Sequence, residues 1–517
     1  MKKTLIPLSL IAIATSITIS GCSLLDMLYG ISDDGPAVVS GDGSTTKQEL
    51  LYTQKDVSDN NLYSNVDSMP TIGNPHILVV PIWFTDSNNY VSNKDTELVN
   101  INKAIFGTND DTGWYSVKTF YEEESGGLCS IQGSVADWYN CGYSYESVNS
   151  GETVKRIVNN AVNSWKNANP TIVKDYDYDG NGYIDGVIAI YGGPNYKNSR
   201  RGDEEVMWAY TTWANNFADK ESPNVEAYIW ASYDFMYTNT IYPVKLDTHT
   251  YVHETGHLFG LDDYYDYNGI GAWAGGFSMQ DLNIAGHDPY SLMALGWAKP
   301  YVPTETSEII IRPFYSTRDV IMLTPEYTAS PFDEYILIEL YSPHGVNYLD
   351  SIRKYSQSSP TGSLYTGIRV WHVDSRLIYS TSHRYVGGKD VYTFEKSTSV
   401  KKGRNYIVGC TNTTPTGSEN DKYCSKEYSL RDYKLLELIK ENDPNHYRYN
   451  SYFDTNSLFG RGSTFNSNYK NYFVNSSGRD SIVFNNGLAF NWSFEVTSLS
   501  AESATIKVTK LGAENNA

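Results

Sequence analysis

The chain has 517 residues, of which 40% are hydrophobic and 19% are charged, a composition typical of a folded soluble protein. This length is too great for one compact core, so we expect two folded domains. The formal net charge of -20 and the pI near 4.9 disfavour nucleic acid as a partner, because they repel phosphate groups and no basic stripe with interleaved aromatic residues offsets them.

Residues 1–21 have the form of a bacterial lipoprotein signal peptide. Two lysines precede an apolar run from Leu5 to Ile19, which is shorter than a typical membrane span. The next residues, ending in Cys22, match a lipobox in which this cysteine is acylated and becomes the mature N-terminus; plain signal cleavage is the alternative. We therefore expect an exported protein, on the bacterial cell surface or outside the cell, anchored to a membrane by lipid.

Residues 22–70 are rich in Asp, Ser, Gly and Asn and lack sustained hydrophobic periodicity. This composition is typical of a flexible tether that holds folded domains away from a membrane. A short pro-segment is the alternative.

Four cysteines remain after Cys22, an even number in a chain that we expect to be exported, and this permits two disulfides. Proximity in the sequence predicts that Cys129 pairs with Cys141 and that Cys410 pairs with Cys424. Free thiols are the alternative.

Residues 71–300 predict a domain in which helices accompany a mixed sheet. His76–Phe84 is a near-continuous apolar strand, the kind that is buried on both faces of such a sheet. Amphipathic helices are predicted at 116–124 and 152–168, and further strands at 128–138, 187–191 and 201–213.

The stretch from Asp175 to Asp185 places oxygen ligands at alternate positions, with glycines that allow a tight wrap. We predict a calcium loop that starts at Asp177, with Asp175 as a competing first position. No glutamate closes the loop as in an EF-hand, and an acidic solvated turn is the alternative. The predicted calcium ligands are Asp177, Asp179, Asn181, the Tyr183 carbonyl and Asp185.

A zinc-binding pattern, HExxHxxGxxD, runs from His253 to Asp263. On a helix His253 and His257 lie on one face about 6 Å apart, so that both imidazoles reach one zinc ion. Glu254 stands beside them as a general base. Gly260 then permits a turn with positive φ, after which Asp263 can return as the third ligand.

Two neighbouring aspartates, Asp262 and Asp266, compete for the third position, and so does a more distant carboxylate such as Asp281. Spacing favours Asp263. Together with Met279 downstream, the pattern matches the metzincin arrangement, in which a methionine-containing turn lies beneath the metal.

Beyond Pro300 the pattern changes to short alternating strands, such as 334–340 and 367–374. A polar region at about 380–430 interrupts them. The fold class predicted is therefore α+β, with a metzincin-like catalytic domain at 71–300 followed by a β-sandwich-like domain at 301–517.

From about residue 76 onward the chain resembles the immune inhibitor A family of bacterial secreted metallopeptidases. The resemblance implies that His253 and His257 bind zinc, that Glu254 is the catalytic base and that the loop from Asp177 to Asp185 holds calcium. Six separated segments carry it: the strand at 76–84, the helix and stop at 116–127, the loop at 177–185, the HETGHLFGLDD motif, the stretch 292–297 and GIRVWHVD at 367–374.

These observations predict an exported zinc endopeptidase that acts on polypeptides. In metzincins the strand before the active-site helix binds extended substrate, and residues 206–210 are the candidate here. Two alternatives remain. One is a surface adhesin or glycan-binding lipoprotein with a vestigial protease fold, and the other is a zinc amidase that acts on cell-wall peptides.

Overall fold

The computed structural model describes eleven stretches of the chain, which are residues 38–40, 46–60, 68–195, 206–237, 244–266, 269, 271–355, 360–386, 389–402, 404–407 and 434–512. The predicted signal peptide, the lipidation candidate Cys22 and the predicted pair Cys410 and Cys424 lie outside these residues. No helix in the described stretches has the length and apolar character needed to span a bilayer.

The N-terminal half is built on a mixed sheet, as the sequence predicted, and the strand order is β3-β2-β6-β9-β7. Strands β2, β3, β6 and β9 are parallel, whereas β7 runs antiparallel to β9 at one edge. Because β6 and β9 are buried at every position, they are apolar runs without alternation. The bounds are β2 His76–Trp83, β3 Gln132–Val135, β6 Gly186–Tyr191, β7 Tyr210–Trp213 and β9 Ala227–Ser232, with β4 Tyr139–Asn140 also paired to β2.

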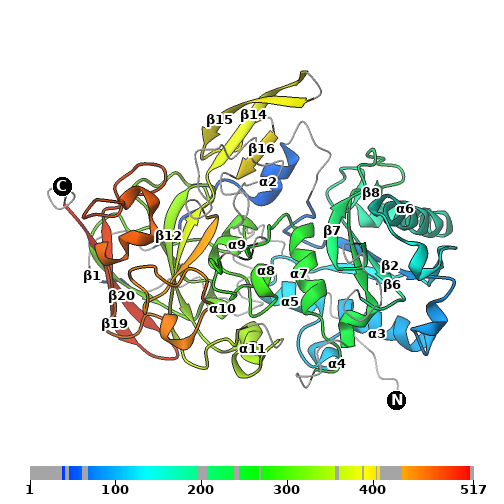
Figure 1. Ribbon diagram of the computed structural model, residues 1–517, viewed down its shortest axis with the longest axis horizontal. Helices are drawn as coiled ribbons and strands as arrows, with labels where there is room; N and C mark the ends of the chain where they lie inside the picture. Colours follow the sequence, from blue (N-terminus) through cyan, green and yellow to red (C-terminus); the bar gives the residue numbers. More distant parts are fainter. Residues whose placement is uncertain are drawn as a thin grey trace, which may run out of the picture.

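Helices cover both faces of this sheet (Figure 1). On one face α6 packs its predicted apolar stripe, including Val154 and Ile157, against alternate residues of the strands such as Leu78 and Tyr228. The opposite face carries the helix with the zinc-binding pattern, α7. The helices of this half are α3 Lys94–Phe106, α4 Asn109–Thr112, α5 Val117–Glu124, α6 Gly151–Ala168, α7 His249–Leu258, α8 Met279–Leu282 and α9 Pro289–Ala294.

The predicted strand at 128–138 is shorter in the structure. From this part of the chain, β3 pairs with β2, and β4 pairs with β2 just beyond the predicted range. Gly133 has φ +140°, and a Cβ there would lie 2.0 Å from the carbonyl oxygen of Ile77. The strand therefore approaches β2 too closely for a side chain at that position. The predicted strand at 201–213 is likewise reduced to β7, and residues 201–205 lie outside the described part.

The C-terminal half contains two sheets that share one apolar core, consistent with the predicted sandwich-like region. One has the order β1-β10-β20-β19-β18 and the other β11-β12-β13-β17, and isoleucines of β10, β12 and β20 meet between them. The bounds are β1 Val38–Ser40, β10 Ser307–Ile311, β11 Val320–Leu323, β12 Glu334–Tyr341, β13 Gly367–Asp374, β17 Leu436–Ile439, β18 Thr464–Phe465, β19 Trp492–Leu499 and β20 Ala504–Lys510.

The region expected to be a polar interruption contains a third small sheet, with the order β15-β14-β16. Two short helices complete the described part of this half. The bounds are β14 Leu377–Val386, β15 Lys389–Ser397, β16 Arg404–Ile407, α10 Phe314–Thr317 and α11 Tyr348–Ile352.

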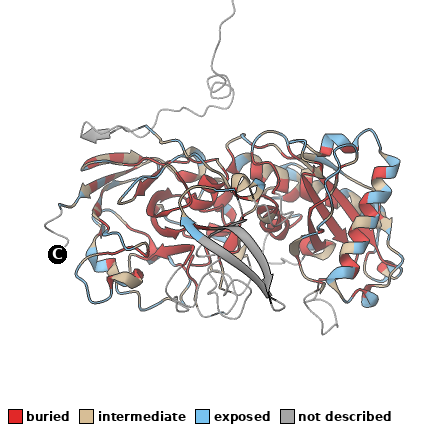
Figure 2. Cartoon of the chain, turned by 90° about the horizontal axis from the view of Figure 1, so that it is seen from above, coloured by how far each residue is buried: buried red, intermediate tan, exposed pale blue. Residues whose placement is uncertain are grey.

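The largest apolar core runs across the expected boundary near residue 300. It joins residues of α7 and α9 to Leu337 of β12, Trp371 of β13 and Phe453. Figure 2 shows the buried residues continuing from the strands of one half into those of the other. The segment that contains Met279 is thus supported from the C-terminal half.

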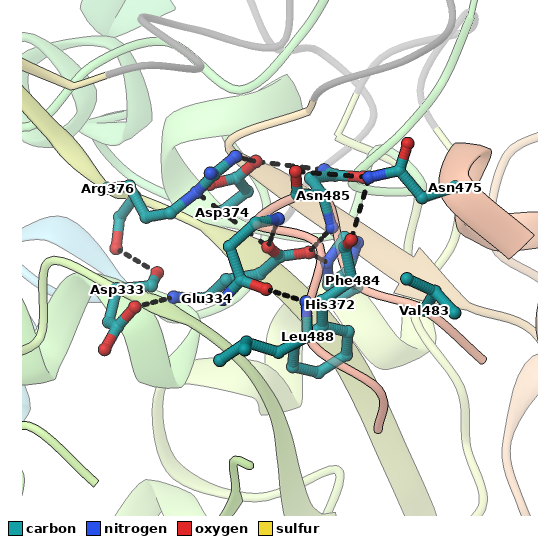
Figure 3. A network of polar contacts seen from close by, with 12 residues as sticks. Asp333, Glu334, His372, Asp374, Arg376, Asn475, Val483, Phe484, Asn485 and Leu488 are labelled. Atoms are coloured by element: carbon teal, nitrogen blue, oxygen red, sulfur yellow. Dashed lines mark hydrogen bonds and ion pairs between the residues drawn. The ribbon is translucent and has the colours of Figure 1, made fainter. Parts of the chain in front are cut away.

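The GIRVWHVD motif forms β13, where His372 and Asp374 belong to a buried network (Figure 3). His372 Nε2 lies 3.0 Å from Glu334 Oε1, and Arg376 Nε donates to Asp374 Oδ1 at 2.6 Å. Asn485 joins both carboxylates, since its backbone N–H donates to Glu334 and its side chain donates to Asp374. The network fixes β12 and β13 to the loop at residue 485.

The predicted tether at 22–70 is wrong for residues 46–60. Thr53 caps helix α2, Gln54–Asp59, through a capping box, and the backbone N–H groups of Gln48 and Leu51 donate to Pro300 and Ala329. This stretch is therefore packed on the folded body.

The predicted disulfide between Cys129 and Cys141 is also wrong, because both are free thiols. The backbone around Cys129 pairs with Gly73, before β2 begins, whereas Cys141 N–H donates to Trp83 at its far end. Ten residues of extended chain span roughly 30 Å, and a disulfide needs Cα atoms within about 7 Å.

Candidate metal centre

Helix α7 is a core helix, since every residue except His257 is buried. Its end is set by Gly260, which has φ +95°, and the N–H of Leu261 donates to the carbonyl of Gly256. A Cβ at Gly260 would also lie 2.7 Å from Gln54 of α2. Glycine is thus required by both backbone conformation and packing, and the turn brings Asp263 back over the helix.

Three side chains converge at this turn. His253 Nε2 lies 2.9 Å and His257 Nε2 lies 3.3 Å from the same oxygen, Oδ1 of Asp263. Ligands bound to a tetrahedral zinc at about 2.0 to 2.1 Å are separated by roughly 3.3 Å, so the donor atoms fit zinc in both spacing and chemistry. Among the described residues they form one of two groups of acidic, histidine or cysteine side chains close enough to share a metal ion.

The Nδ1 atom of each imidazole is hydrogen-bonded to a backbone carbonyl. His253 Nδ1 lies 2.8 Å from the carbonyl oxygen of Met279, and His257 Nδ1 lies 2.7 Å from that of Leu261. A carbonyl oxygen only accepts, so both Nδ1 atoms carry the proton. Both Nε2 atoms are then left to face Asp263, the arrangement in which metal-binding histidines are held.

His257 and Asp263 shift each other's pKa values. Burial favours the neutral acid at Asp263, but the adjacent His257 and His253 outweigh it and hold the pKa of this carboxyl well below its usual range. Burial likewise opposes the charged form of His257, yet Asp263 raises the pKa of its imidazole to about 10. Asp263 is therefore an ionised ligand candidate.

Glu254 is buried beside this group, and burial raises the pKa of its carboxyl. The hydroxyl of Thr211 on β7 lies 3.0 Å from both Oε2 and the carbonyl oxygen of Glu254 and donates to them. Thr211 thereby positions the carboxylate. This role could not be predicted from the sequence, because a threonine in an edge strand belongs to no motif.

Met279 is buried at the start of α8, and its carbonyl oxygen is the acceptor for His253. The next residue, Gln280, packs directly on α7, since a Cβ at Gly256 would lie 2.3 Å from its Oε1. His287 lies 3.2 Å from that same Oε1 and 3.1 Å from Glu124. His287 is therefore a buried structural residue and not part of the metal group.

The three carboxylates that compete with Asp263 for the third zinc position lie outside the metal group. Asp281 accepts from the backbone N–H of Gly276 at 2.8 Å, and Asp266 accepts from that of Gly271 at 3.0 Å. Burial raises the pKa of Asp262 to about 7. None of the three belongs to the group formed by the described residues His253, His257 and Asp263.

One turn before His253, the buried His249 stacks on Trp114 with ring centres 3.9 Å apart. Its Nδ1 lies 2.8 Å from Asp247 and its Nε2 lies 3.6 Å from Asp350 on α11. Burial lowers the pKa of this imidazole, but Asp350 and Asp247 outweigh burial and raise it to about 9. Asp350 also accepts from Ala285 N–H at 2.5 Å, so α11 holds both α7 and the segment after Met279.

The predicted calcium loop folds as a tight turn before β6. Carboxylate oxygens of Asp177, Asp179 and Asp185 lie within 4.8 Å of one another, the second such group among the described residues. Asp175 is not a member, which favours the register that starts at Asp177. The side-chain oxygen of Asn181 accepts from the backbone N–H of Tyr183 at 2.8 Å.

Asp185 also joins this loop to the sheet, because its Oδ2 accepts from His76 N–H at the start of β2 at 2.7 Å. Burial raises the pKa of its carboxyl to about 8. Lys55 of α2 reaches the same cluster, with Nζ 2.8 Å from Asp179 Oδ2. The acidic loop thus has a cationic partner from the N-terminal segment.

Comparisons with known proteins find similarity to metalloproteases. The chain is 26% identical over 246 residues to the pre-pro-metalloprotease PrtV of Vibrio cholerae serotype O1, in strains M66-2 and ATCC 39315 / El Tor Inaba N16961. The aligned region is 40% of this chain and 25% of those relatives, so the chain matches only a quarter of their length.

Metalloproteinase-II from Bacteroides fragilis, a solved structure, aligns over 41% of this chain and 51% of its own at 10% identity with a TM-score of 0.17, a likeness too low to bear on the fold. Residues 83–281 match the family model described as immune inhibitor A peptidase M6, catalytic domain. This region contains the histidines, Glu254, Asp263 and Met279, so the metal group lies within the part of the chain that matches this family model.

Proposed function

We propose that this chain is a zinc-dependent endopeptidase with His253, His257 and Asp263 as the protein ligands. The observation that carries the proposal is the convergence of both Nε2 atoms on one Asp263 oxygen, while both Nδ1 atoms are held by backbone carbonyls. The family match supports metallopeptidase chemistry in the same region.

When bound, zinc polarises the scissile carbonyl and makes the attacking water more acidic. Glu254 accepts the proton of that water and then delivers it to the leaving amine. Its buried position suits this role, because burial brings the pKa of a carboxyl closer to neutral pH. Thr211 holds Oε2 in place for both transfers.

Polypeptide is the substrate class that the neighbouring strand supports. In the described part of the chain β7 pairs only with β9, which leaves its other edge for an extended peptide. Because Thr211 on this strand contacts Glu254, a peptide paired with β7 lies next to the catalytic base. The strand lies at 210–213 and shares Tyr210 with the segment 206–210 that the sequence suggested.

The metzincin arrangement is also part of the proposal. The turn at Gly260 supports it because it brings Asp263 back over the ligand helix. The contact between His253 and the Met279 carbonyl supports it because it places a methionine-containing segment against that helix.

We further propose that Asp177, Asp179 and Asp185 hold calcium, with Asn181 and the Tyr183 carbonyl as the remaining candidates. The clustering of three carboxylates supports a hard cation with oxygen ligands. Bound calcium would take the place of the Lys55 ammonium at Asp179 and stiffen the link from the loop to β2.

Export and lipid anchoring at Cys22 belong to the proposal as well, and they rest on the N-terminal sequence alone. Polypeptides outside the cell would then be the substrates.

Digestion of a mixed protein library, compared with purified cell wall, tests the reaction class. An endopeptidase cleaves many library proteins and leaves the wall intact. Release of wall peptides without protein cleavage would favour the amidase. If neither substrate is cleaved, the adhesin would be favoured.

A further inference from the structure

A cavity of about 920 Å³ lies beside β7 and the start of α6, a size ordinary for a ligand pocket. Four aromatic residues line it, Trp208, Tyr210, Trp213 and Tyr228, and the side chains of Glu152 and Lys155 from α6 complete it. Aromatic walls thus share the lining with polar groups, which include one charge of each sign.

Tyr210 and Thr212, which line the cavity, lie on the face of β7 opposite to Thr211, which contacts Glu254. Tyr210 and Thr212 stand opposite Trp230 and Tyr228 of β9, and these two residues belong to the core on the α6 side. Thr211 between them points to the other face, where it contacts Glu254. Neighbouring residues of β7 therefore point in turn to the side that faces Glu254 and to the side that lines the cavity.

A peptide that pairs with the outer edge of β7 repeats this alternation, because successive side chains of a paired strand point to opposite faces of the sheet. A residue that faces the Glu254 side is followed by one that faces the α6 side. We propose that the cavity is a specificity subsite, which receives a large aromatic side chain of the substrate one residue from a position on the catalytic face.

This inference rests on the proposed peptidase function and narrows its substrate class. Aromatic walls favour an aromatic guest through offset and edge contacts beyond simple burial. Continuity with Glu254 through β7 identifies the occupant as bound substrate.

The test measures kcat/KM of the zinc-loaded, full chain for a peptide series in which each position near the cleaved bond is Ala, Leu, Phe or Trp in turn. The wild type should prefer Phe or Trp over Ala at one position by about 10- to 100-fold, the range expected for filling an apolar pocket. Thr212→Trp fills the cavity and should abolish that preference, so that kcat/KM for the Phe and Trp peptides falls to that for the Ala peptide in the same variant.

Thr464→Trp, a matched change at an exposed strand position of the C-terminal half, should keep the preference. If Thr212→Trp does not fold, Trp213→Ala at the half-exposed wall of the cavity replaces it, and it should weaken the preference about tenfold.

A wild type that cleaves peptides with equal kcat/KM for Ala and aromatic residues at every position overturns the subsite and leaves the peptidase proposal intact. An equal loss for all peptides in both cavity variants also overturns it. A zinc-loaded wild type that cleaves no peptide overturns the proposed function itself.

Discussion

Replacing Asp263 with Ala should remove the third ligand and weaken zinc binding sharply. Its Oδ1 lies near both imidazoles, at 2.9 Å from His253 Nε2 and 3.3 Å from His257 Nε2. Loss of a group that only supports a zinc ligand costs about 10- to 100-fold in affinity, so loss of a direct ligand should exceed about 100-fold. That factor corresponds to about 2.7 kcal/mol of binding free energy.

Competition with a coloured chelator measures this change, and the peptidase rate at limiting zinc should fall in parallel. Asp262→Ala and Asp266→Ala are the controls, since neither residue belongs to the metal group, and both should keep zinc and activity. An unchanged zinc affinity in Asp263→Ala would refute the geometric reasoning, and Asp281 would be the next ligand to test.

Three further outcomes follow from other parts of the structure. Removal of calcium, or Asp179→Ala, should lower Tm while zinc stays bound. Lys55→Met should tighten calcium binding in calorimetry because it removes the competing ammonium. An unchanged Tm, with no calcium found by elemental analysis, would support the alternative of a solvated turn. The raised pKa of His249 contributes stability that is complete below pH 6.5 and is lost as pH rises through about 9, so the free energy of unfolding should fall over that range by up to about 3 kcal/mol. His249→Gln should flatten that pH profile in urea titrations, and an unaltered slope would contradict the assignment. Gly256→Ala should displace Gln280 and cost about 1 to 3 kcal/mol of stability. It should also weaken zinc binding, because the adjacent Met279 carbonyl holds His253. Wild-type values of Tm and zinc affinity in this variant would count against this packing.

The metal group could be predicted from the sequence because its geometry is local. The spacing of His253, His257, Gly260 and Asp263 follows from one helix and one turn, and these set the positions of the donor atoms. Thr211 could not be predicted, since it reaches Glu254 only after β7 pairs at the edge of the sheet.

Proximity in the sequence misled the prediction for Cys129 and Cys141. The chain between them runs parallel to β2 in two short strands, so a short separation along the sequence becomes a long one in space. The contact between His249 and Asp350 was missed for the opposite reason, because it joins distant segments through tertiary packing.

For residues 46–60 the tether prediction failed, because a polar composition indicates a flexible segment only when that segment has no binding partner on the folded body. In the structure, Lys55 binds the acidic loop and Gln54 packs against Gly260, so polar residues of α2 find partners on the folded body.

The central claim is that Glu254 transfers protons at a zinc site that it does not ligate. Casein cleavage and zinc content, measured together for the wild type and Glu254→Ala with and without a chelator, test it most directly. We predict full zinc in the variant with a rate at least ~10²-fold lower, and wild-type activity that is lost with the chelator and restored by zinc. Normal turnover by zinc-loaded Glu254→Ala, or wild-type cleavage that persists without metal, would contradict the account.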